Sequence, residues 1–104
     1  MFTLENLDAI IAQRANSSAA ESYTKTLLAK GVAKCARKFG EEAVEATVAA
    51  LVEDEAALRA EAADVIYHLL VLLRARGVAW ADVLAELEGR TSQSGLQEKA
   101  SRTG

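Results

Sequence analysis

The chain of 104 residues contains no proline, one cysteine and one histidine. The single cysteine, Cys35, has no second cysteine with which to form an internal disulfide bond. One cysteine and one histidine are also too few for the thiolate and imidazole ligands of a structural zinc site. Any metal site in this chain therefore has to be built from oxygen ligands.

Basic charge and long hydrophobic runs are also scarce. The formal net charge of -3 argues against nucleic-acid binding, which requires a strongly basic face. The longest apolar run, residues 65–73, is interrupted by His68 and falls far short of the roughly 20 residues that span a bilayer. Residues 1–14 lack the basic start and the cleavage site of a signal peptide. We expect a single cytoplasmic domain, residues 1–104, without nucleic-acid or membrane partners.

The composition predicts an all-α fold, because alanine and leucine dominate and proline is absent. We expect a bundle of four to five helices. One long helix runs from Val32 to about Val52. The next, Glu55 to Arg76, is capped by Asp54 and ended by Gly77.

The other predicted helices are shorter. Ser18, with Glu21 three residues later, forms a capping box that opens a helix ending at Gly31. The remaining elements are a helix capped by Thr3 that ends near Asn16, a helix from Ala81 to Glu88, and an irregular tail from about Gly89.

Carboxylates border the apolar faces of both long helices. Successive helical residues turn by about 100°. Glu61 and Asp64 therefore lie on the same side as the apolar run that follows them, so this helix is expected to be central in the bundle. On the preceding helix, Glu41 and Glu45 align with valines further along, and Glu42 lies beside them.

Two antiparallel helices joined by a short turn would bring these acidic sets face to face. Two like charges about 5 Å apart repel by roughly 3 kcal/mol at an effective dielectric near 20, so the cluster needs a neutralising partner. Carboxylate-rich oxygen sites suit Mg²⁺ or Mn²⁺, and Mg²⁺ completes its shell with water and substrate phosphate. The pattern favours Mg²⁺-dependent phosphate chemistry, with a simple solvated acidic face as the alternative.

Other polar residues have less specific roles. His68 is expected to donate to a backbone carbonyl or support the site rather than bind metal, and Cys35 is expected to be a small buried hydrophobic residue. Lys34 and Lys38 precede the acidic cluster and serve either solubility or contacts to the phosphates that the metal binds.

Several segments combine into a larger pattern. The acidic part is Glu41-Glu42-x-x-Glu45, fifteen residues, then Glu61-x-x-Asp64. The accompanying segments are Ser22-Tyr23-Thr24, Lys30-Gly31, Tyr67-His68-Leu69-Leu70, and Ser94-Gly95-Leu96 with Glu98-Lys99 and Arg102. Together they resemble the phosphoribosyl-ATP pyrophosphohydrolase family, within the all-α, MazG-like nucleotide pyrophosphohydrolases.

This resemblance implies hydrolysis of phosphoribosyl-ATP to phosphoribosyl-AMP and pyrophosphate, the second step of histidine biosynthesis, by a helical homodimer with Mg²⁺, which Mn²⁺ can replace. It also implies a role for each matching residue. The implied metal ligands are Glu42, Glu45, Glu61 and Asp64. Glu41 is implied to be either a further ligand or the residue that orients the attacking water, and all five acids are implied to be catalytic. The implied phosphate contacts are Lys34, Lys38, Lys99 and Arg102.

Two other functions stay open. A housekeeping enzyme that hydrolyses nucleoside triphosphates would use the same acids, and only the segments Ser22–Thr24 and Ser94–Arg102 argue against it. A non-catalytic helical interaction module would need no metal, but it leaves Glu61 and Asp64 without a partner. In both enzyme readings water is the nucleophile, because the sequence offers no serine, histidine and acid arrangement.

Overall fold

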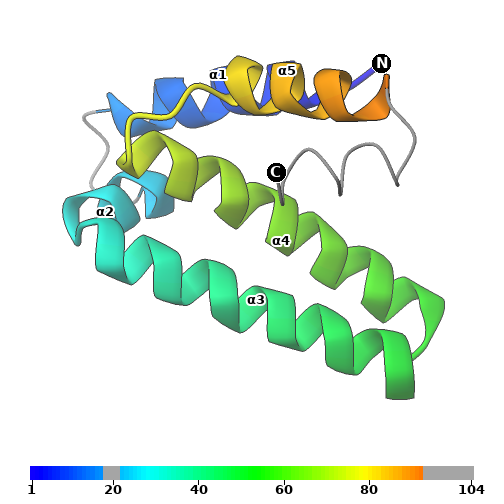
Figure 1. Ribbon diagram of the computed structural model, residues 1–104. Helices are drawn as coiled ribbons and strands as arrows, with labels where there is room; N and C mark the ends of the chain where they lie inside the picture. Colours follow the sequence, from blue (N-terminus) through cyan, green and yellow to red (C-terminus); the bar gives the residue numbers. More distant parts are fainter. Residues whose placement is uncertain (18–21, 93–104) are drawn as a thin grey trace.

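The computed structural model describes residues 1–17 and 22–92, and it contains five α-helices within those ranges (Figure 1). This architecture confirms the predicted all-α bundle. Ser18, Glu21, Lys99, Arg102 and the segment from Ser94 lie outside the described residues. The helices are α1 (Leu4–Ala15), α2 (Tyr23–Ala29), α3 (Val32–Val52), α4 (Glu55–Ala75) and α5 (Trp80–Thr91).

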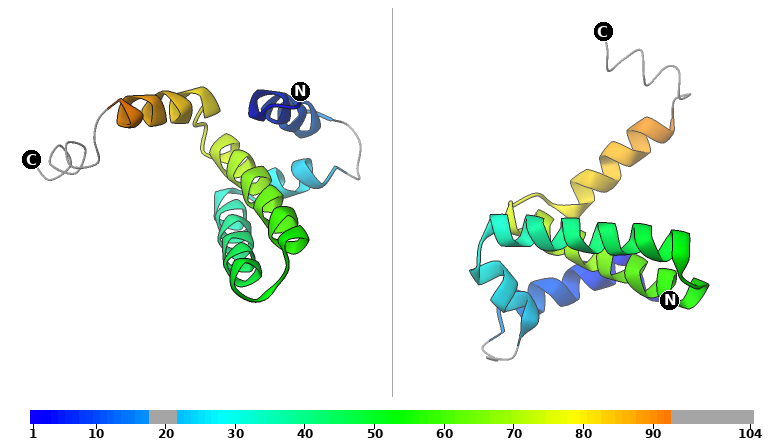
Figure 2. Two further views of the ribbon diagram at one scale, coloured as in Figure 1. Left: turned by 90° about the vertical axis from the view of Figure 1, so that its right-hand side faces the viewer. Right: turned by 90° about the horizontal axis from the view of Figure 1, so that it is seen from below.

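The framework is an antiparallel hairpin of α3 and α4, which lie side by side in both figures (Figures 1 and 2). The predicted bounds of α3 are confirmed, and α4 begins as predicted at Glu55 but ends at Ala75, with the predicted last residue Arg76 as its C-cap. Asp54 accepts a hydrogen bond from the backbone nitrogen of Ala57 at 2.8 Å and thereby caps α4. Gly77, with φ of 72°, follows the C-terminal end of the same helix.

The start of α2 differs from the prediction. Ser22, not Ser18, is the N-cap, and its hydroxyl accepts from the backbone nitrogen of Lys25 at 3.2 Å. An N-cap side chain reaches only the second or third N–H group of its helix. Ser18 lies four residues too early to cap a helix that begins at Tyr23. The prediction for α1 holds, since Thr3 caps it.

The helix α5 is longer than predicted. It begins at Trp80 and continues to Thr91, so the prediction of an irregular tail from Gly89 is wrong for these last helical residues. A glycine inside a helix costs only about 1 kcal/mol relative to alanine. The Arg90–Glu86 ion pair at 3.2 Å supports this turn. Figure 2 shows α5 leading away from the α3–α4 hairpin.

The hydrophobic core lies at one end of the hairpin, where α1 and α2 cover the start of α3 and the second half of α4. Cys35 is 1% exposed and belongs to this core, as predicted, and burial raises the pKa of its thiol. An ion pair of 3.5 Å between Asp8 and Arg74 joins α1 to α4 at the edge of the core. The buried core residues are Ile11, Leu27, Cys35, Leu70 and Val71.

The prediction that α4 is central holds only for its second half. Leu70 and Val71 are buried there, whereas Ile66 is 39% exposed and Leu58 is 36% exposed. The reason is length, because the shorter helices α1 and α2 cover one end of the hairpin and leave the other end to α3 alone. No described helix is long and apolar enough to span a membrane.

Gly31 is predicted to be indispensable to the α2–α3 connection. Its backbone has φ of 94° and ψ of 173°, a conformation that side-chain-bearing residues avoid. Gly31→Ala should lower the free energy of unfolding by about 1–3 kcal/mol in urea titrations. The control Gly89→Ala, inside α5 with nothing within 4 Å of the added methyl group, should raise it by about 0.5–1 kcal/mol. Equal midpoints for Gly31→Ala and wild type would contradict this account.

Candidate metal centre

Carboxylates from α3 and α4 meet between the two helices. Glu42 and Glu45 are neighbours along one side of α3, and Glu61 faces them from α4. One carboxylate oxygen from each of the three lies within 4.8 Å of the others. The antiparallel hairpin thus brings together residues from both halves of the predicted acidic pattern.

The burial of this cluster makes it costly without a cation. Glu42 is 8% exposed, and the Oε2 atoms of Glu42 and Glu61 are both buried without a hydrogen-bond partner among residues 1–17 and 22–92. A buried, unsatisfied polar atom costs about 1–3 kcal/mol, more when it is charged. Carboxylates at this separation also repel by roughly 3 kcal/mol at an effective dielectric near 20. The donor set and its unsatisfied oxygens fit a divalent cation such as Mg²⁺ or Mn²⁺.

Lys38 neutralises only one edge of the cluster. Its Nζ atom lies 3.5 Å from Oε1 of Glu41 and 3.5 Å from Oε1 of Glu42. Burial acts to lower the pKa of this ammonium group, but Tyr23, Glu41 and Glu42 together raise it above its ordinary value. Lys38 therefore stays charged, yet it leaves the buried Oε2 atom of Glu42 unsatisfied.

Glu41 and Asp64 border the cluster rather than joining it. The side chain of Glu41 is 49% exposed and faces Lys38. Asp64 is also exposed, one helical turn after Glu61 on α4. The backbone oxygen of Asp64 accepts a hydrogen bond from Nδ1 of His68 at 2.9 Å. This bond confirms the expectation that His68 donates to a backbone carbonyl.

The predicted phosphate contacts are only partly described. Lys34 lies on α3 one turn before Lys38, half-buried, and it forms no ion pair with any residue of the described ranges. Its ammonium group is therefore available to a ligand on the same side of α3. Lys99 and Arg102 lie outside the described residues.

Tyr23 is a residue that reasoning from side-chain chemistry overlooked. Burial raises the pKa of its phenol, Lys38 lowers it, and Tyr67, Glu42 and Asp64 raise it further. The phenol is thus within electrostatic reach of both the lysine and the acids. The only signal in the sequence was the segment Ser22-Tyr23-Thr24, which entered through the family resemblance alone.

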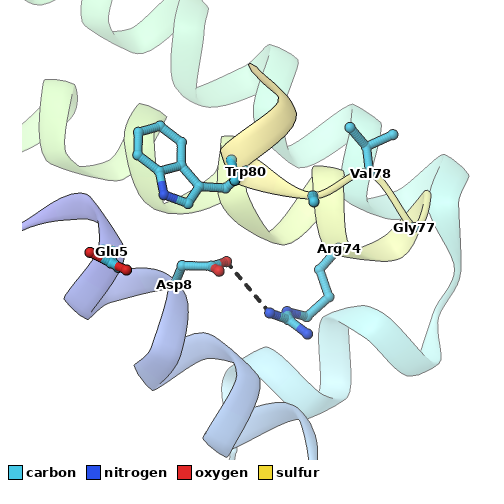
Figure 3. Close-up of a pocket in the computed structure, with 8 residues that line it drawn as sticks. Glu5, Asp8, Arg74, Gly77, Val78 and Trp80 are labelled. Carbon is cyan, nitrogen blue, oxygen red and sulfur yellow. Dashed lines mark hydrogen bonds and ion pairs between the residues drawn. The ribbon is translucent and has the colours of Figure 1, made fainter. Parts of the chain in front are cut away.

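A pocket of about 470 Å³ lies at the other end of α4, away from the acidic cluster (Figure 3). Figure 3 shows the Asp8–Arg74 pair beneath the indole of Trp80. Arg74 follows Glu61 by 13 residues, which is about 20 Å along a helix. Because its walls contain none of the predicted acids, this pocket is separate from the candidate metal centre.

Comparison with known proteins gives consistent matches over nearly the whole chain. The family model described as phosphoribosyl-ATP pyrophosphohydrolase matches residues 4–91. A phosphoribosyl-ATP pyrophosphatase of Dinoroseobacter shibae is 59% identical over 102 residues, covering 98% of this chain and 100% of the relative. Proteins with the same name from Methylobacterium radiotolerans and Agrobacterium fabrum are 57% and 52% identical, each covering 97% of this chain and 94% of the relative.

Removing the charge of Glu61 should have opposite effects on the free energy of unfolding with and without bound metal. In EDTA, Glu61→Gln should keep or raise the free energy of unfolding, because it removes repulsion at a buried position. With Mg²⁺ at about 100 times its Kd, the wild type should gain about 2.7 kcal/mol, and the variant should gain much less. Thermal unfolding with and without MgCl₂ measures both effects.

A matched control for this experiment is Glu88→Gln, which removes an exposed carboxylate from α5. This variant should retain the full response to Mg²⁺. If Glu61→Gln were destabilised in EDTA and responded to Mg²⁺ as strongly as wild type, the cluster would be structural and not a metal centre.

Proposed function

The chain belongs to the phosphoribosyl-ATP pyrophosphohydrolase family, and we propose that it hydrolyses phosphoribosyl-ATP to phosphoribosyl-AMP and pyrophosphate in histidine biosynthesis. The family match and the identical names of its close relatives support this substrate. The observation on which the chemistry rests is the group of carboxylates from α3 and α4 within 4.8 Å of one another, with two buried oxygens unsatisfied.

In the proposed site, Glu42, Glu45, Glu61 and Asp64 hold Mg²⁺, or Mn²⁺ in its place. A bound Mg²⁺ offsets charge on the polyphosphate and lowers the pKa of an attacking water. Glu42 and Glu61 fit this role because each has a buried oxygen without a partner. Glu45 completes the compact group. Asp64 lies outside that group, one turn after Glu61 on α4, and is included by family resemblance.

Glu41 has a different environment from the four proposed ligands. Its exposed carboxylate contacts Lys38 and lies outside the compact group. We favour a role in orienting the attacking water over a role as a ligand, since an exposed carboxylate can accept a proton or a hydrogen bond from water beside the phosphates. All five acids are catalytic in this proposal.

The basic residues contact the substrate phosphates. Lys38 already lies at the edge of the cluster, and Lys34 precedes it by one turn on the same side of α3. Lys99 and Arg102 belong to the same proposed set by family resemblance. A polyphosphate needs cations on several sides, and lysines at the rim of a metal site supply the charge that the ion does not.

The proposed enzyme acts as a homodimer that pairs through the uncovered end of the α3–α4 hairpin. Apolar side chains there are exposed to solvent, with Leu51 at 78% and Val44 at 63%. Several large apolar side chains exposed on two neighbouring helices of a small domain suit an interface between subunits. The residues of this face are Val44, Val48, Leu51, Val52, Leu58 and Ile66.

Activity measurements test the substrate and the acids together. Pyrophosphate release from phosphoribosyl-ATP should require Mg²⁺ and should fall by about 100-fold or more in Glu45→Gln and Asp64→Asn. Both residues are exposed, so these variants should stay folded. Glu55→Gln, an exposed acid at the start of α4, is the matched control and should keep wild-type activity.

The control substrates dCTP and dUTP separate the proposed function from its rivals. Release mainly from these nucleotides would assign the chain to nucleotide housekeeping. Absence of turnover on every substrate, with the protein folded and Mg²⁺ present, would favour the non-catalytic interaction module.

The homodimer has its own test. Leu51→Lys places a charge in the exposed apolar face and should convert a dimeric wild type into a monomer in sedimentation equilibrium, because an unpaired charge is costly to bury. Leu84→Lys, at an equally apolar but separate position on α5, should leave the dimer intact. A monomeric wild type, or a Leu51→Lys variant that still dimerises, would contradict pairing through this face.

A further inference from the structure

Two adjacent side chains of α2 are fixed to two adjacent side chains of α4. The hydroxyl of Tyr23 lies 3.3 Å from Nε2 of His68. The hydroxyl of Thr24 forms a hydrogen bond with the phenol of Tyr67. Thr24 and His68 are buried, at 1% and 6% exposure. The proposed metal site uses none of these side chains, so their arrangement needs a separate explanation.

The direction of the hydrogen bond between Tyr23 and His68 follows from the neighbouring contact. Nδ1 of His68 lies 2.9 Å from the backbone oxygen of Asp64, and a carbonyl oxygen can only accept. Nδ1 therefore carries a proton, and in the neutral form of the ring Nε2 carries a lone pair. In that form the hydroxyl of Tyr23 donates to Nε2. Its oxygen then offers only lone pairs to any third group.

Tyr23 packs against Tyr67 and His68 and is otherwise partly exposed to solvent. Its ring stacks on Tyr67 with centroids 6.3 Å apart and meets the edge of His68 at 6.0 Å, yet the residue remains 49% exposed. The raised pKa of its phenol, caused first by burial, keeps the hydroxyl protonated and able to donate to His68. The exposed phenol shares electrostatic surroundings with Lys38, Glu42 and Asp64.

The chemistry of this position restricts what Tyr23 can contact. Phosphate oxygens near neutral pH are acceptors, so a phenol whose own proton is committed to His68 cannot bond to them. The hydroxyl groups of a nucleotide's sugar are donors that suit such an oxygen. Lys38, which pairs with Glu41 and Glu42 at the edge of the cluster, interacts electrostatically with the same phenol and carries the positive charge that suits phosphates.

Building on the proposed function, we propose that Tyr23 is a specificity-determining residue that accepts a hydrogen bond from a sugar hydroxyl of the nucleotide substrate. His68 acts as the positioning residue, because its ring orients the hydroxyl of Tyr23. In this arrangement the cations bind the substrate phosphates, and the phenol oxygen of Tyr23 accepts a hydrogen bond from the sugar.

The test compares the full-length enzyme with Tyr23→Phe, using phosphoribosyl-ATP and saturating Mg²⁺. Loss of one hydrogen bond to bound substrate should raise KM by about tenfold and leave kcat nearly unchanged. Tyr67→Phe is the matched control, because it removes a phenol hydroxyl from the other pair that joins α2 to α4. Its KM should stay within about twofold of wild type.

Each alternative outcome is decisive. An equal rise in KM for Tyr67→Phe would show that α2 anchoring causes the effect, and it would overturn the assignment of Tyr23. A fall in kcat with a shifted pH profile and an unchanged KM would mean that Tyr23 acts on the attacking water, which also overturns it. An active wild type with an unaffected Tyr23→Phe variant overturns this assignment alone, whereas a wild type inactive on phosphoribosyl-ATP overturns the proposed function as well.

Discussion

The close approach of carboxylates from α3 and α4 is the constraint on which the rest of the structure depends. Glu42 and Glu61 each have a buried oxygen that no group in the described part of the chain hydrogen-bonds. Such an arrangement persists only if the surrounding packing holds the two helices together against their mutual repulsion. The core formed by Ile11, Leu27 and Val71 lies at one end of the hairpin and supplies this packing. The favourable packing of the core thus offsets the repulsion between the carboxylates and keeps them close together.

The position of α2 follows from the same need for packing that holds α3 and α4 together. The caps at Ser22 and Gly31 make α2 short and turn the chain sharply into α3. A short helix has little apolar surface, so α2 depends on Thr24, Leu27 and two hydrogen-bonded pairs to α4 for its position. That position brings an aromatic side chain to the rim of an otherwise carboxylate-rich site. On the proposed role of Tyr23, fold and recognition are linked through a single seven-residue helix.

The sequence predicted those parts of the fold whose signals are local. Asp54 and Gly77 act on the backbone within a few residues, so the bounds of α4 followed from them. The approach of Glu61 to Glu42 also followed, because helical periodicity and an antiparallel turn leave few alternatives. The exposure of Ile66 did not, since periodicity shows which residues share a face and not whether another helix covers it. The contact between Tyr23 and His68 joins residues 45 positions apart and depends on tertiary packing that no local pattern contains.

Lys38 shows why a cation between the helices would suit the cluster better than one nearby. Its ammonium group approaches Oε1 of Glu41 and Oε1 of Glu42 from within α3, at 3.5 Å in each case. This distance exceeds the roughly 2.8 Å of a strong charge-assisted hydrogen bond. A side chain rooted on α3 can balance the acids of its own helix, but it leaves Oε2 of Glu61 on the opposite helix unsatisfied. A small divalent ion can bond to oxygens of both helices at once, and binding it would convert the repulsion across the hairpin into a link between α3 and α4.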